Sequence, residues 1–158
     1  MDALARKLGE RLKAAGAKLV TAESCTGGWA AQVATSVAGS SDWFERGFVT
    51  YSNDAKREML GVREETLIQH GAVSEETARE MAQGALSRSR GTVALAVTGV
   101  AGPGGGSAAK PVGTVCFAWA SARSVRSETQ QFSGDRESVR RQSVIRALEG
   151  VLQHLDGG

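Results

Sequence analysis

The stretch that most constrains this chain is Thr21-Ala22-Glu23-Ser24-Cys25-Thr26-Gly27-Gly28. An apolar run from Ala17 to Ala22 leads into it, and a helical pattern from Trp29 to Val37 follows it. The stretch therefore predicts a strand, a tight turn and the start of a helix. Such a turn offers the unpaired N–H groups of a helix N-terminus to an anion or to a developing negative charge.

The predicted turn also carries reactive side chains. Ser24 and Cys25 are both candidate nucleophiles, and Thr26 can cap the following helix. The pair Gly27-Gly28 allows the backbone to approach a ligand closely. An ordinary helix cap is the simplest explanation of this stretch, so a catalytic interpretation requires partners from other segments.

The remaining segments alternate between helical and strand patterns. Leu4, Leu8 and Leu12 recur at helical spacing. Further helices are expected at the segment capped by Asn53 or Asp54, at residues 64–70, from Ser74 to about residue 88, and after Asp135. Further strands are expected at residues 47–52, 93–97, 115–120 and 127–132. This order predicts an α/β fold, a three-layer α/β/α sandwich with a mixed, mostly parallel sheet.

Length and composition narrow the classes of function. The 158 residues suit a single domain spanning residues 1–158, and a net charge of +2 does not indicate nucleic-acid binding. No apolar run is long enough to span a membrane, and no secretory signal is recognisable, so we expect a cytoplasmic protein. The two cysteines and two histidines lack metal-binding spacing, which argues against a zinc site.

A second candidate segment is Thr98-Gly99-Val100-Ala101-Gly102-Pro103-Gly104-Gly105-Gly106-Ser107. It follows the apolar run at residues 93–97, and open α/β sheets bind ligands at such strand ends. Its backbone N–H groups could cradle a phosphate, although no Gly-Lys-Ser/Thr ends it as in a P-loop. A surface connection without ligand remains the alternative.

A third candidate segment supplies a base for Ser24. The two histidines do not adjoin a strand-end motif, so a Ser-His-Asp triad is poorly supported. Lys56 can replace histidine if burial lowers its pKa enough to keep the amine neutral. Tyr51 could relay the proton or orient the lysine. Spacing alone does not establish that Ser24 and Lys56 meet.

The last helix adds two arginines. At helical spacing, Arg140 and Arg141 fall near the apolar stripe of this helix and lean towards the body of the protein. They either extend along the surface to water or form a fork on a phosphate. Glu23 points away from Ser24 while it remains in the strand. It either pairs with a base or contacts the residues that hold the site residues in place.

Several ordered motifs together resemble the CinA C-terminal domain family. They are the stretch at residues 21–28, Gly-Ser-Ser-Asp-Trp-Phe at 39–44, Gly-Phe-Val-Thr-Tyr-Ser-Asn at 47–53 with Lys56, Gly-Ala-Val-Ser at 71–74, Thr-Gly-Val-Ala-Gly-Pro-Gly-Gly at 98–105 and Lys-Pro-Val-Gly-Thr-Val at 110–115. The resemblance covers roughly Leu4 to Leu152. It is strongest to the stand-alone members that deamidate nicotinamide mononucleotide.

The resemblance implies hydrolysis of the carboxamide of nicotinamide mononucleotide to nicotinate mononucleotide and ammonia, in pyridine nucleotide salvage. It implies no metal and no organic cofactor. Carried over by motif, Ser24 is the nucleophile, Lys56 its base and Tyr51 an assisting hydroxyl. The expected substrate-binding residues, which hold the oxyanion or the phosphate, are Thr26, Gly27, Gly28, Thr98, Gly99, Gly102 and Arg141.

Two other functions stay open on the sequence alone. Cys25 could be the nucleophile, because a thiol is intrinsically more reactive and a helix N-terminus lowers its pKa. The chain could instead be a nucleotide-binding or regulatory module without turnover. The oligomeric state also stays open, with a homo-oligomer among the options.

Overall fold

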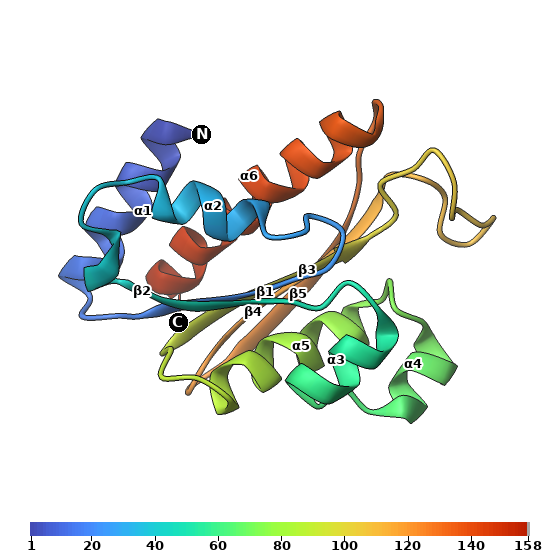
Figure 1. Ribbon diagram of the computed structural model, residues 1–158, viewed down its shortest axis with the longest axis horizontal. Coiled ribbons are helices and arrows are strands. Elements are labelled where there is room, and N and C mark those ends of the chain that lie inside the picture. The colour runs from blue at the N-terminus through green and yellow to red at the C-terminus, as the bar shows by residue number, and fades with distance from the viewer. Residues whose placement is uncertain (158) are drawn as a thin grey trace.

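The computed structural model describes residues 1–157 and has a five-stranded sheet between two layers of helices (Figure 1). The helices on one face are α1 (Asp2–Ala14), α2 (Trp29–Thr35) and α6 (Arg136–Gly157). Those on the other face are α3 (Asn53–Leu60), α4 (Glu64–His70) and α5 (Glu75–Ser87). The predicted three-layer α/β/α sandwich is confirmed.

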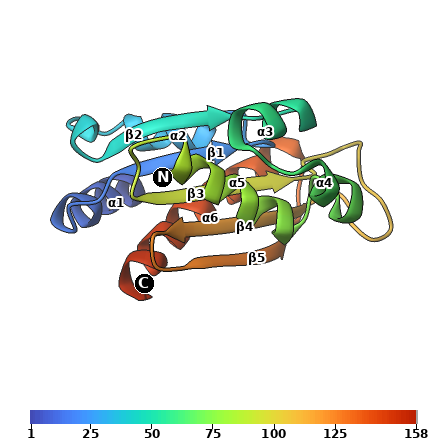
Figure 2. The same cartoon turned by 90° about the horizontal axis from the view of Figure 1, so that it is seen from below.

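The sheet has the strand order β2-β1-β3-β4-β5 (Figure 2). In chain order the strands are β1 (Leu19–Glu23), β2 (Phe44–Val49), β3 (Val93–Gly99), β4 (Thr114–Ser121) and β5 (Val125–Gln131). β1 pairs in parallel with β2 and β3, whereas β4 pairs antiparallel with β3 and β5. Of these strands only β4 runs against the others, so the sheet is mixed and mostly parallel in direction, as predicted.

The two faces of the sheet are packed differently. On β3 and β4 the larger side chains, Leu95, Phe117 and Trp119, belong to the core shared with α1, α2 and α6. The alternate positions of the same strands are mostly alanines, which pack with small residues of α5 in the core on the other face. Small side chains on both partners let α5 lie close to the sheet.

The second strand and the helix after it begin at different residues from those predicted. β2 pairs along the whole of β1, so it starts at Phe44 and leaves the sheet after Val49 instead of running over residues 47–52. Ser52, rather than Asn53 or Asp54, caps α3, because its hydroxyl accepts the Ala55 N–H at 3.0 Å. The caps predicted at Ser74 and Asp135 are confirmed by equivalent bonds.

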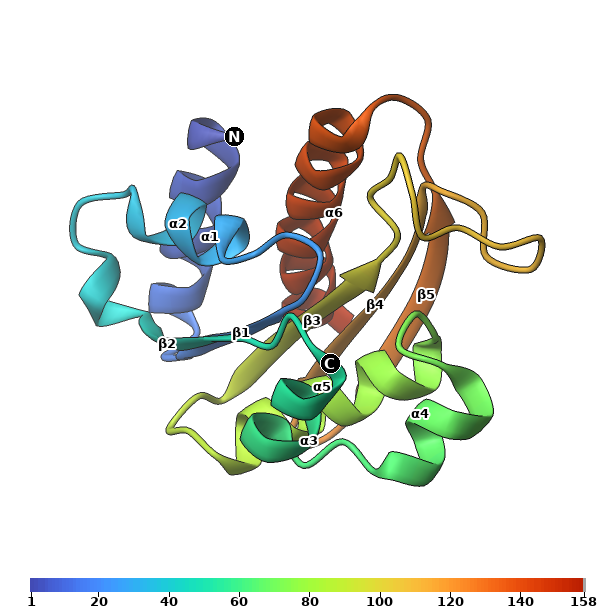
Figure 3. The same ribbon diagram turned by 45° about the vertical axis from the view of Figure 1, so that its right-hand side comes forward.

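Parallel strands bring the candidate segments to one edge of the sheet. The turn after β1, the segment leading into α3 after β2, and the glycine-rich loop after β3 all follow carboxyl ends at that edge (Figure 3). β1 lies between β2 and β3 in the sheet: the chain passes from β1 to β2 on one side, and then from β2 to β3 on the other side of β1. Ligands bind at such points of reversal in open α/β sheets. Within residues 1–157, no helix has the length and apolar character needed to cross a membrane.

Gly150 provides a test of the core between α6 and the sheet. A Cβ added there would lie 2.0 Å from ring carbons of Trp119, whose Nε1 donates to the Ala147 carbonyl at 2.9 Å. We expect Gly150→Ala to lower the free energy of unfolding by about 1–3 kcal/mol, although alanine favours helices. Urea denaturation measures this change. The control is Gly157→Ala in the same helix: its added Cβ meets no atom within 4 Å, so the free energy of unfolding should not fall. A Gly150→Ala protein as stable as wild type would contradict the packing argument.

Candidate active site

The structure brings Ser24 and Lys56 into contact. The Nζ of Lys56 lies 3.0 Å from the Oγ of Ser24 and donates to the Thr50 carbonyl at 3.1 Å. Both side chains are buried, with 7% of Ser24 and 1% of Lys56 exposed. The turn after β1 supplies the hydroxyl and the first turn of α3 supplies the amine, so the two segments chosen from the sequence form one site.

Burial determines the protonation chemistry of Lys56. Loss of water around the amine lowers its pKa from the ordinary value of 10.5, and the proximity of Cys25 offsets this in part. The two groups that Lys56 contacts, a hydroxyl and a carbonyl, are uncharged and do not replace a counter-ion. A neutral amine in this position can accept the Ser24 proton across the same contact.

Burial has the opposite consequence for Cys25. It raises the pKa of the thiol to about 12, a shift that the backbone and the nearby Arg140 and Lys56 only partly oppose. The helix N-terminus is expected to lower the pKa of this thiol, but its pKa is raised. A thiol with this pKa stays protonated near neutral pH, whereas the thiolate is the reactive form.

The predicted helix cap at Thr26 is wrong. α2 begins after Gly28, which has a φ of 103° and no capping side chain. The carboxylate of Glu23 serves the helix instead, accepting the N–H groups of Ala30 at 2.8 Å and Ala31 at 3.0 Å. Thr26 donates its hydroxyl to the same carboxylate at 2.5 Å. Glu23 therefore supports the turn and forms no bond with Lys56.

The two neighbouring arginines of α6 have different surroundings. Arg140 donates to the carbonyls of Cys25 and Thr26, each at 3.1 Å, and so holds the turn. Arg141 pairs with Glu137 at 3.3 Å and is half-exposed. Both guanidinium groups also lie over the Trp29 ring. Neither arginine lines the cavity beside Ser24, so the arrangement gives no support to a phosphate contact from Arg141.

A cavity of about 290 Å³ opens beside the Ser24–Lys56 pair. The predicted residues that line it are Ser24, Lys56, Tyr51, Thr98, Gly99 and Gly102, together with the alternative nucleophile Cys25. Thr98 is held by a bond from its hydroxyl to the Ala72 carbonyl at 2.9 Å. Thr26, Gly27 and Gly28 lie in the turn next to the cavity and are not among its lining residues.

Arg136 is the lining residue that the sequence reasoning missed. Its guanidinium donates to the Gly102 carbonyl at 2.8 Å and to the Tyr51 hydroxyl at 3.0 Å. Tyr51 is 61% exposed, and its hydroxyl contacts Arg136 rather than Ser24 or Lys56. The signal that could have found Arg136 is topological: β5 points the same way as β3, so α6 begins at the edge that carries the site.

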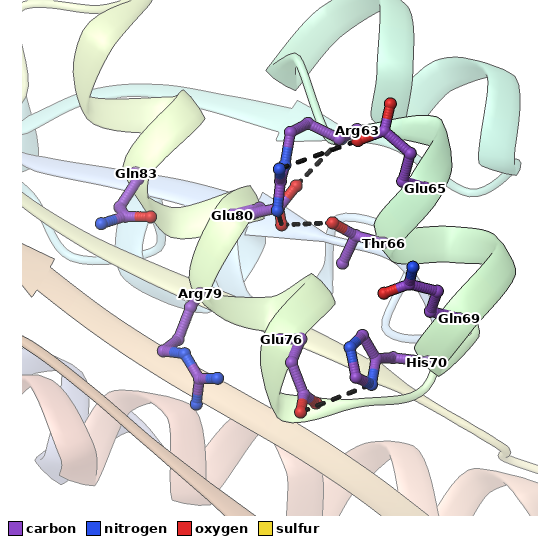
Figure 4. A pocket seen from close by; sticks show the side chains of 9 residues that line it. All are labelled: Arg63, Glu65, Thr66, Gln69, His70, Glu76, Arg79, Glu80 and Gln83. Atoms are coloured by element: carbon purple, nitrogen blue, oxygen red, sulfur yellow. Dashed lines mark hydrogen bonds and ion pairs between the residues drawn. The ribbon is translucent and has the colours of Figure 1, made fainter.

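A second hollow, of about 380 Å³, lies between α4 and α5 (Figure 4). Several of its side chains contact one another: Arg63 lies 3.5 Å from Glu80 and 3.8 Å from Glu65, and His70 lies 3.5 Å from Glu76. The one hydroxyl among its lining residues, on Thr66, donates to the Glu80 carboxylate at 2.5 Å, and Arg63 contacts the same carboxylate. The Ser24 hydroxyl instead meets an amine whose two contacts are uncharged, so the smaller cavity at Ser24 is the candidate active site. Among the described residues, no cluster of three or more potential metal ligands occurs.

Known proteins resemble this chain over almost its full length. The nicotinamide-nucleotide amidohydrolase PncC of Escherichia coli K12 is 59% identical over 151 residues, covering 95% of this chain and 92% of that protein. The protein of the same name from Pseudomonas putida is 57% identical over 150 residues, covering 95% and 94%. A crystal structure of a competence-damaged protein (CinA) superfamily member from Klebsiella pneumoniae has a TM-score of 0.96 at 39% identity, covering 99% and 98%.

The profile of the CinA C-terminal domain matches residues 1–155. This match agrees with the sandwich fold and with the similarity to PncC proteins over 95% of the chain. The chain belongs to the CinA C-terminal domain family.

Proposed function

We propose that this protein hydrolyses the carboxamide of nicotinamide mononucleotide, giving nicotinate mononucleotide and ammonia in pyridine nucleotide salvage. The observation that carries the proposal is the 3.0 Å contact between the Ser24 hydroxyl and the buried Lys56 amine at a ligand-sized cavity. The names of the PncC relatives, at 57% and 59% identity, support this substrate.

In the first step, the neutral amine of Lys56 takes the Ser24 proton while Oγ attacks the amide carbon. The tetrahedral intermediate needs donors for its oxyanion. The N–H groups of Ser24 and Gly27 already donate to the carbonyls of Val97 and Ser24, each at 3.0 Å. Among the remaining amides of the turn, that of Cys25 belongs to a residue that lines the cavity, so we assign the oxyanion to the Cys25 N–H.

In the second step, the Lys56 ammonium returns its proton to the leaving nitrogen, and the C–N bond breaks to release ammonia. Water then attacks the acyl-Ser24 ester, with Lys56 again accepting a proton. Cleavage of the ester regenerates the Ser24 hydroxyl and frees the nicotinate mononucleotide. The reaction uses only these side chains and backbone donors.

The phosphate of the substrate is assigned to Arg136 and the backbone of the loop at residues 98–106. A guanidinium binds phosphate oxygens with charge-assisted hydrogen bonds, and Arg136 lines the cavity next to Gly102. The N-terminus of α2 is a poor alternative, because the Glu23 carboxylate already occupies it. In this assignment Tyr51 orients Arg136 and does not relay the Ser24 proton.

Replacing each candidate nucleophile separates the serine mechanism from the cysteine one. Ser24→Ala should lower kcat on the order of a thousandfold or more, because no other group can form the acyl-enzyme. Cys25→Ala should keep turnover, since the thiol with a pKa of about 12 is protonated. Ammonia release from nicotinamide mononucleotide measures both. An active Ser24→Ala variant with an inactive Cys25→Ala variant would reverse the assignment, and binding by calorimetry without any ammonia would favour a regulatory module.

The pH dependence tests Lys56 as the base. Its neutral form is the reactive one, so kcat/KM should rise with pH and level off above the Lys56 pKa. Because burial lowers that pKa, the midpoint should lie below 10.5. Initial rates across the pH range give the midpoint. Lys56→Arg, which remains charged, should lose activity by roughly 10²–10⁴-fold and show no such rise; a midpoint above 10.5 in the wild type would rule against a buried neutral base.

The phosphate assignment predicts a difference between two substrates. Arg136→Met should raise KM for nicotinamide mononucleotide by roughly 30-fold or more, because a charged hydrogen-bonded pair is lost. Nicotinamide riboside lacks the phosphate and should be turned over equally by both proteins. The control is Arg141→Met, five residues along the same helix and outside the cavity, for which KM should not change. If Arg141→Met raises KM more than Arg136→Met does, the phosphate contact belongs to Arg141 instead.

A further inference from the structure

Glu23 is a fully buried carboxylate, 0% exposed, one residue before the candidate nucleophile. Three donors surround it: the Thr26 hydroxyl at 2.5 Å and the N–H groups of Ala30 and Ala31 at 2.8 and 3.0 Å. A carboxylate removed from water requires such donors, because its desolvation is otherwise costly. Its side chain therefore ties both the turn and the first turn of α2 to the end of β1.

The backbone on either side of this carboxylate is anchored as well. The Glu23 carbonyl accepts the Thr50 N–H at 2.8 Å, and the Ser24 N–H donates to the Val97 carbonyl at 3.0 Å. The Thr50 carbonyl in turn accepts the Nζ of Lys56 at 3.1 Å. Glu23 thus connects the segment that carries the nucleophile with the segment that orients its base.

α2 depends on this carboxylate for its N-terminus. The helix has seven residues, begins after a glycine, and has no side-chain cap of its own. Helices this short are unstable without tertiary contacts. The Glu23 carboxylate accepts hydrogen bonds from two of the free N–H groups, and its negative charge is stabilising at the positive end of the helix dipole. Loss of the contact would therefore release the turn at its helical end.

We propose that Glu23, acting through the Thr26 hydroxyl, is a positioning residue that holds the Ser24 hydroxyl in line with Lys56. This inference rests on the proposed function, because it concerns the same pair of reacting groups. Glu23 does not line the cavity, so its effect on the reaction is indirect. A small displacement of Ser24 would lengthen the 3.0 Å contact beyond hydrogen-bonding distance and slow the proton transfer.

Substitutions at Thr26 test the proposal without altering the buried charge. Thr26→Val keeps the shape of the side chain and removes its hydroxyl, whereas Thr26→Ser keeps the hydroxyl. We expect Thr26→Val to lower kcat by roughly 10- to 100-fold with little change in KM, and Thr26→Ser to restore most of the rate. Glu23→Gln should lower kcat to a similar extent as Thr26→Val. The amide NH₂ of glutamine cannot accept the hydrogen bond that a backbone N–H of α2 donates to the Glu23 carboxylate. Ammonia release from nicotinamide mononucleotide measures these values.

Thr66 provides a matched control for the loss of a hydrogen bond. Its hydroxyl donates to the Glu80 carboxylate at 2.5 Å in the hollow between α4 and α5, and only 3% of the residue is exposed (Figure 4). Thr66→Val should lower the melting temperature as Thr26→Val does, yet leave kcat within about twofold. Equal kcat losses in the two variants, or a Thr26→Ser variant as slow as Thr26→Val, would overturn the proposal.

A second readout does not depend on the nucleotide. A fluorophosphonate forms a bond between its phosphorus and the Ser24 oxygen as the P–F bond breaks, with Lys56 taking the hydroxyl proton and fluoride leaving. Its labelling rate therefore reports the reactivity of that hydroxyl. Thr26→Val should slow labelling by on the order of tenfold, with Thr26→Ser and Thr66→Val near wild type. If the variants show these labelling rates but the wild-type protein releases no ammonia, the proposed function is overturned and the positioning role is kept. Equal labelling rates in an ammonia-releasing enzyme would overturn the positioning role alone.

Discussion

The contact between the buried Lys56 amine and the Ser24 hydroxyl is the interaction on which the rest of the site depends. Desolvation disfavours the charged form of any titratable group, so its effect differs in sign between bases and acids. For Lys56 it lowers the pKa and favours the amine that can accept a proton. For the adjacent Cys25 it raises the pKa and favours the unreactive thiol. One environment therefore favours the uncharged forms of both groups, which is what the proposed serine mechanism requires.

Two opposite charges hold the turn that carries these groups. The Glu23 carboxylate accepts a hydroxyl and two N–H groups on one side, and the Arg140 guanidinium donates to the carbonyls of Cys25 and Thr26 on the other. Both charges are engaged with the protein itself, and neither residue lines the cavity. Arg136 also contacts the protein, at Gly102 and Tyr51, but it lines the cavity, and the proposed function assigns the substrate phosphate to it.

Much of the fold could be predicted because its signals are local. The caps at Ser74 and Asp135 and the apolar run at residues 93–97 each need only a few neighbouring residues to be recognised. The start of β2 could not be predicted, because Phe44 joins the sheet only through pairing with Leu19, far away in the sequence. The Ser24–Lys56 contact has the same character: chemistry and family motifs suggested the pair, but the parallel sheet brings it together.

The arginines of α6 show most clearly where prediction from sequence ends. Arg136 and Arg141 are separated by five residues, which places them about 140° apart around a helix. Which of them faces the cavity therefore depends on how the helix is rotated against the sheet. That rotation is set by contacts such as the Trp119 ring against Gly150, more than two turns further along the helix. The order of residues at the start of this helix does not contain this information, so the proposed assignment of the phosphate to Arg136 depends on the packed structure.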